Sequence, residues 1–162
     1  MICLILILSF LLEGVFSNVI EINSALLPCF SLISLAIIYP YFKDKNINFL
    51  IASLLTGIFY DIAFTNTPFI NSVVFVFCGF IIRWFYKYVN FNFLTQILLT
   101  ILIVLVNRLT IYLILCVFDY TNFNEDILIS SILSSLIANI IYSAIMFYVL
   151  HHFCKVKTKK II

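Results

Sequence analysis

Three charged side chains lie inside long apolar segments of the sequence: Glu13, Asp61 and Arg108. A charge near the middle of a transmembrane helix costs ~2.5 to 3.5 kcal/mol on insertion scales, so each is expected to face the protein interior and find a partner. Asn107 adds a polar side chain next to Arg108. We predict that Arg108 pairs with Glu13 or Asp61. Such a group either fixes helix packing or forms a polar pocket for a ligand or a partner helix.

The sequence has no pattern typical of a catalytic site. It lacks a GxSxG or HExxH motif, and its three glycines are too few for a phosphate-binding loop. His151, His152 and Cys154 lie close together near the C-terminus, but no second group of ligands accompanies them, so we expect no metal site. The net charge of +2 is too small for a nucleic-acid surface. We expect a non-enzymatic protein without a cofactor.

The composition indicates that these side chains are carried by membrane helices. Of the 162 residues, 65% are apolar and 10% charged, whereas roughly a quarter are charged in soluble domains. Crossing a bilayer takes ~20 apolar residues as a helix, and the apolar runs lack the alternation of membrane strands. We predict an all-α integral membrane protein, a single domain over 1–162. Its six transmembrane helices form one compact bundle over segments 2–20, 25–42, 47–64, 69–86, 91–118 and 127–151.

The basic residues predict the orientation of the helices. Eight of the nine lie in alternate connectors or in the C-terminal tail, namely Lys43, Lys45, Arg83, Lys87, Lys155, Lys157, Lys159 and Lys160. Because short cytoplasmic loops carry an excess of Lys and Arg, both termini are expected to be cytoplasmic. The basic tail is expected to contact anionic membrane lipid.

Small and polar residues recur about four positions apart in four of the segments. This spacing places them on one helix face, where small residues allow close packing and hydroxyl groups bond between helices. We expect these faces to point inward: Ser9, Glu13 and Ser17; Ser53, Gly57 and Asp61; Gln96, Thr100, Asn107 and Arg108; Ser131, Ser135, Asn139 and Ser143.

The third and fourth segments carry a recognisable series of residues. In order these are Gly57, Asp61, Pro68, Asn71, Gly79 and Arg83. The series resembles the MreD family of bacterial rod shape-determining proteins, in kind and order. The resemblance implies a non-catalytic subunit of the cell-elongation machinery in the bacterial cytoplasmic membrane, which organises lateral peptidoglycan synthesis. It also implies partnership with an MreC-like bitopic protein and, through it, with MreB filaments, the polymerase RodA and a class B penicillin-binding transpeptidase.

An alternative function follows from the fold that the resemblance implies. That fold is similar to the substrate-binding subunits of energy-coupling-factor vitamin transporters, in which the outer half of the bundle binds a small molecule. Glu13, Asp61 and Arg108 would line such a pocket. Against this alternative, segment 2–20 lacks the AxxxA pattern by which those subunits commonly dock to their partner.

Overall fold

The described part of the protein is helical throughout. The structure is a computed structural model that describes residues 2–19, 28–42, 46–65, 69–118 and 125–153. Its helices are α1 (Ile2–Val19), α2 (Phe30–Ile38), α3 (Asn46–Tyr60), α4 (Ile70–Tyr88), α5 (Phe93–Val117) and α6 (Glu125–Phe153). A 3-10 turn at Tyr39–Phe42 extends α2, and a π-helical turn at Asp61–Thr65 extends α3. The all-α fold is therefore confirmed for these residues.

Four helical segments are long and apolar enough to cross a membrane. They are Ile47–Phe64, Ile70–Tyr88, Phe93–Val117 and Leu128–His152, which match the last four predicted segments to within a few residues. The apolar helices Cys3–Ser17 and Phe30–Phe42 are shorter. Within the second predicted segment, 25–42, Pro28 and Cys29 are not helical and α2 begins at Phe30, while residues 25–27 lie outside the described residues.

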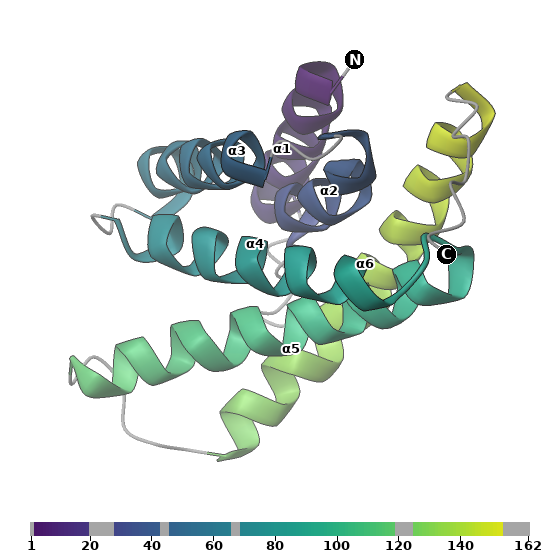
Figure 1. Ribbon diagram of the computed structural model, residues 1–162. Coiled ribbons are helices and arrows are strands. Elements are labelled where there is room, and N and C mark those ends of the chain that lie inside the picture. The colour runs from purple at the N-terminus through teal and green to yellow at the C-terminus, as the bar shows by residue number, and fades with distance from the viewer. Residues whose placement is uncertain (1, 20–27, 43–45, 66–68, 119–124, 154–162) are drawn as a thin grey trace.

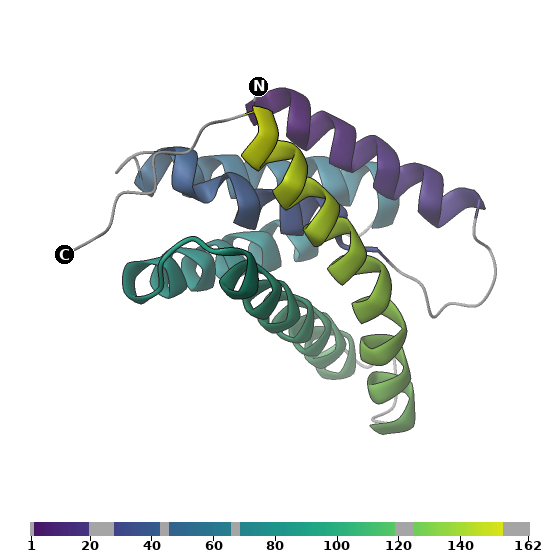
Figure 2. The same ribbon diagram turned by 90° about the vertical axis from the view of Figure 1, so that its right-hand side faces the viewer.

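Helix α2 occupies the centre of the arrangement. All of its residues are buried, and it contacts each of the other five helices. The remaining helices surround it in a chain of neighbours, α3 along α4, α4 along α5 and α5 along α6, while α1 and α6 both pack on α2 (Figure 1). Figure 2 shows α6 crossing the bundle obliquely toward α1 and α2. The centre is therefore formed by segments far apart in the sequence.

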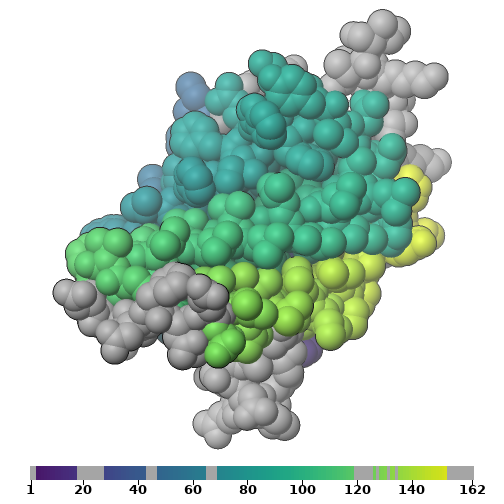
Figure 3. Space-filling view, turned by 90° about the horizontal axis from the view of Figure 1, so that it is seen from below, coloured from purple at the N-terminus to yellow at the C-terminus, as the bar shows by residue number. Residues whose placement is uncertain are grey.

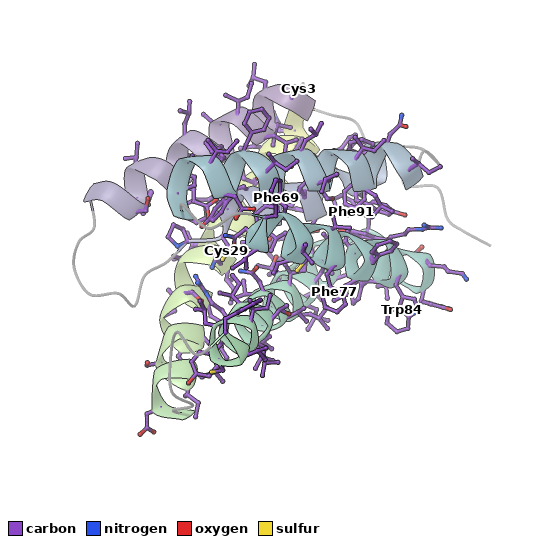
Figure 4. All side chains as sticks on the ribbon, turned by 90° about the vertical axis from the view of Figure 1, so that its left-hand side faces the viewer. Cys3, Cys29, Phe69, Phe77, Trp84 and Phe91 are labelled. Atoms are coloured by element: carbon purple, nitrogen blue, oxygen red, sulfur yellow. The ribbon has the colours of Figure 1, made fainter. Side chains whose placement is uncertain are left out.

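The outer surface of the bundle is apolar. Helices α4, α5 and α6 lie side by side on the face shown in Figure 3. Large side chains project from α4 away from the neighbouring helices, among them Phe77 and Trp84 (Figure 4). Trp84 lies near the C-terminal end of α4, where an aromatic ring is suited to the membrane interface. This surface suits contact with lipid acyl chains.

Candidate functional site

The predicted inward-facing residues are buried, with few exceptions. Ser17 is exposed and donates to the Gly14 carbonyl oxygen of its own helix, Arg108 is half-buried, and the side chain of Ser131 lies outside the described residues. The buried members come from α1, α3, α5 and α6, with Asp61 just beyond α3: Ser9, Glu13, Ser53, Gly57, Asp61, Gln96, Thr100, Asn107, Ser135, Asn139 and Ser143. The polar faces thus form the interior of the bundle.

Asp61 holds the beginning of α4. Its Oδ1 accepts hydrogen bonds from the backbone N–H (3.0 Å) and side-chain Nδ2 (2.9 Å) of Asn71. Its Oδ2 accepts from the backbone N–H (2.9 Å) and hydroxyl (2.6 Å) of Ser72. The N–H groups of a first helical turn have no partners within the helix, and the N-cap residue Phe69 supplies no side-chain bond. Asp61 therefore caps α4 from the preceding helix, with its negative charge at the positive end of the helix dipole.

Two glycines allow α3 and α4 to approach closely. A Cβ atom on Gly57 would lie 2.6 Å from the Cα atom of Ser72, and one on Gly79 would lie 2.9 Å from the hydroxyl oxygen of Ser53. The first contact is with backbone, which a rotamer change cannot relieve. Glycine at position 57 is therefore what permits α4 to lie within hydrogen-bonding distance of Asp61.

Glu13 performs the equivalent role for α2. Its Oε2 accepts hydrogen bonds from the backbone N–H (2.9 Å) and from the hydroxyl group of Ser31, in the first turn of α2. The N-cap residue Cys29 provides no side-chain bond, so Glu13 takes that place from α1. The Tyr60 hydroxyl lies beside the carboxylate, and Arg108 attracts it electrostatically.

The backbone at Cys29 is anchored by two further helices. Its N–H donates to Asn139 Oδ1 on α6 (2.9 Å), while Asn139 Nδ2 donates to the Ser135 carbonyl oxygen. The Cys29 sulfur accepts from Asn107 Nδ2 (3.4 Å) and Arg108 Nη2 (3.5 Å) on α5. Four helices, α1, α2, α5 and α6, thus meet at the start of α2.

A small polar cavity lies at this meeting point. Its volume is about 20 Å³, and it is lined by Glu13, Cys29, Leu32, Tyr60, Asn71, Phe75, Asn107, Arg108 and Ile111. Three of the four polar residues singled out in the sequence, Glu13, Asn107 and Arg108, come together here. Asp61 is one step removed, because it bonds to the lining residue Asn71. A direct contact between Arg108 and a carboxylate stays a prediction.

Tyrosine hydroxyl groups supply interhelical bonds that the sequence analysis did not anticipate. Tyr142 of α6 shares a hydrogen bond of 2.7 Å with Ser34 of α2, and Tyr86 of α4 donates to Gln96 Oε1 of α5 (2.6 Å). Both tyrosines are buried. The sequence gives little signal for this, because a tyrosine within an apolar segment is equally compatible with an interfacial position.

The remaining candidate positions are either exposed away from this cavity or outside the described residues. Arg83 is exposed on α4, and Pro68 lies outside the described residues. His151 and His152 are exposed at the end of α6, while Cys154 is also outside the described residues. Over the ranges that the structure describes, no three His, Cys, Asp or Glu residues are grouped so as to hold a metal ion.

Comparison with family models, curated proteins and solved structures finds no match to this chain. The assignment of a role therefore depends on the residues and their geometry. The central features are two buried acids, each capping the helix that follows its own, and a small polar cavity lined by Glu13 and by Asn71, the hydrogen-bond partner of Asp61.

Proposed function

We propose that this chain is a non-catalytic, six-span membrane subunit of the bacterial cell-elongation machinery, of the MreD type, in the cytoplasmic membrane. The observation that carries the proposal is the construction of the α3–α4 hairpin. Four of the residues on which the family resemblance depends, Gly57, Asp61, Asn71 and Gly79, are the residues that join the two helices. Together these residues let α3 and α4 pack closely and hold the start of α4. Residues that matched the family only by chance would not be expected to share such a role.

The geometry of α1 and α2 supports six spans. Helix α1 has 18 residues, which at ~1.5 Å per residue gives ~27 Å, close to the ~30 Å hydrocarbon thickness of a bilayer. Helix α2 is shorter, but the other helices surround it and the side chains of Glu13 and Asn139 satisfy its first backbone groups. Non-helical backbone at membrane depth is tolerated where protein buries it in this way.

The proposed orientation is the one that the basic residues predict, with both termini in the cytoplasm. In that orientation Glu13, Asp61 and Arg108 lie toward the outer face of the membrane. The cavity would then lie in the outer half of the bundle. Labelling of single cysteines placed in the connectors, with a reagent that cannot cross the membrane, measures this directly.

The size of the cavity favours the elongation role over vitamin uptake. Sites for small organic ligands typically have volumes of ~300 Å³ or more, against about 20 Å³ here. Both carboxylates that could have bound such a ligand instead accept hydrogen bonds at helix starts. A vitamin-binding subunit would need a much larger opening between α1, α3 and α5.

The proposed mechanism is the positioning of partners by helix faces. Lipid-facing side chains run along the helices, for example Leu4 and Leu11 on α1 and Phe77 on α4, and a partner helix that packs there replaces lipid. The expected partners are an MreC-like bitopic protein and, through it, MreB filaments, RodA and a class B transpeptidase. The rigid α3–α4 hairpin would keep such a face in a fixed shape.

The test is purification of the tagged chain from its native cells in mild detergent, followed by mass spectrometry. We expect a bitopic coiled-coil protein together with a cell-wall polymerase or transpeptidase. A second tagged preparation carries Gly14→Ala, whose new methyl group meets only a phenylalanine ring at 3.4 Å. It should recover the same partners. Recovery of two ABC-type ATPases and a large membrane coupling subunit would overturn the proposal in favour of vitamin uptake.

A further inference from the structure

Two buried hydrogen-bond acceptors line the polar cavity. Glu13 Oε1 and Asn107 Oδ1 have no hydrogen-bond partner of normal geometry in the described ranges. Their side chains are 1% and 4% exposed, and both line the cavity. Buried polar atoms of this kind are nearly always bonded, because leaving one unsatisfied forfeits its interaction with water.

The residues that line the cavity determine which group can donate hydrogen bonds to Glu13 Oε1 and Asn107 Oδ1. Two acceptors call for one small group with two hydrogens to donate. The Arg108 guanidinium at the cavity wall disfavours a cation, and the Glu13 carboxylate disfavours an anion. The volume of about 20 Å³ exceeds the ~10 to 15 Å³ that one water molecule requires and leaves no room for an organic ligand.

We propose that this cavity is a binding site for one water molecule, which donates one hydrogen to Glu13 Oε1 and the other to Asn107 Oδ1. A carboxylate oxygen has two lone pairs, so the nearby Tyr60 hydroxyl does not compete with the water for Glu13. The water joins α1 to α5, two helices that do not pack along each other in the described residues. It also stands between the Glu13 carboxylate and the side chains of α5.

An experimental structure at a resolution that shows ordered water tests the proposal on the wild-type protein. The expected result is a single density peak about 2.7 to 3.2 Å from both Glu13 Oε1 and Asn107 Oδ1. A direct contact of Asn107 with Glu13, or a cavity without density in a map that shows other buried waters, would overturn it.

Two variants distinguish the loss of the bound water from the loss of other contacts that Asn107 makes. Asn107→Leu removes one acceptor, occupies a similar volume and should abolish the density peak. Cys29→Ala is the matched control, because it removes the sulfur that accepts from Asn107 Nδ2 but leaves both proposed water ligands in place.

The two variants should also differ in stability. Asn107→Leu should raise the ratio of unfolded to folded protein about 10-fold more than Cys29→Ala, because it removes one of the two acceptors that hold the water against Glu13 Oε1. Equal shifts would mean that the sulfur contact, and not a water, is what Asn107 contributes. Retention of the density peak in Asn107→Leu would likewise exclude the proposed pair of ligands.

Discussion

The close approach of α3 and α4 at Gly57 allows a sharp prediction about a single methyl group. In Gly57→Ala the new Cβ atom would meet the Ser72 Cα at 2.6 Å, the Asn71 carbonyl oxygen at 3.1 Å and the Phe75 Cβ at 3.1 Å. Favourable carbon contacts lie at ~3.5 to 4.0 Å, so α4 must move away from α3 by about 1 Å at Ser72.

The displacement has two energetic consequences. Overpacking of a well-packed interior destabilises by about 1 to 3 kcal/mol. A shift of about 1 Å also stretches the bonds of Asp61 to Ser72, which are 2.6 and 2.9 Å long, and bonds to a charged group contribute about 1.5 to 3 kcal/mol each. Alanine has a better helix propensity than glycine, which offsets this loss by about 1 kcal/mol. We therefore expect Gly57→Ala to lower the free energy of unfolding by about 2 to 4 kcal/mol.

Unfolding of the purified protein by SDS in mixed micelles measures this difference. The sequence contains a single tryptophan, Trp84, which lies on α4, the helix that must move, so its fluorescence reports the transition directly. Gly14→Ala is the matched control, since its Cβ atom meets only the Phe64 ring, at the ordinary contact distance of 3.4 Å. That variant should keep the wild-type midpoint or exceed it.

Unfolding of Gly57→Ala at the wild-type midpoint, or an equal loss of stability in Gly57→Ala and Gly14→Ala, would refute a steric conflict at position 57. Gly79→Ala should fall between the two, because its Cβ atom would meet the hydroxyl of Ser53 at 2.9 Å, a side chain that can rotate away. The expected order of loss is therefore position 57, then 79, then 14.

Two further predictions use the same assay. Asp61→Ala should lower the free energy of unfolding by about 2 to 4 kcal/mol, because the first turn of α4 loses its acceptor. Asp61→Asn keeps one carbonyl oxygen and should lose about half as much. Equal losses in the two variants would contradict the capping role. Tyr142→Phe should lose about 1 kcal/mol through its bond to Ser34 while keeping the ring stacked on Phe30 at 4.3 Å. Combining it with Ser34→Ala should add little, and full additivity would count against that bond.

The helix pattern and the buried faces could be predicted from the sequence for a simple physical reason. Lipid admits only apolar side chains, so polar residues four apart must point toward other helices, as Ser9 and Glu13 or Asn139 and Ser143 do. The ends of the last four segments were also predictable, because charges and turn residues bound them. The start of α2 at Phe30 was not, since hydropathy does not distinguish the non-helical residues Pro28 and Cys29 from the helix that follows them.

The partners of the two acids were not predicted. Charge counting directs attention to Arg108, a basic residue far from the ends of its segment, and overlooks that a helix N-terminus also attracts a carboxylate. The structure gives Glu13 and Asp61 such an end each. A usable signal was present, because in both cases a serine or asparagine stands about three positions after a proline at the start of the next helix: Ser31 after Pro28 and Asn71 after Pro68.

The bond between Cys29 and Asn139 has a consequence for how the chain is made. The two residues are 110 positions apart, and Asn139 belongs to α6, which the ribosome produces after the other described helices. Until α6 enters the membrane, the Cys29 N–H at the start of the central helix lacks its acceptor, and Ser34 lacks Tyr142. The contacts at the start of α2 are therefore completed only once α6 has been made, and we expect a chain truncated before α6 to be degraded faster in cells than the full chain.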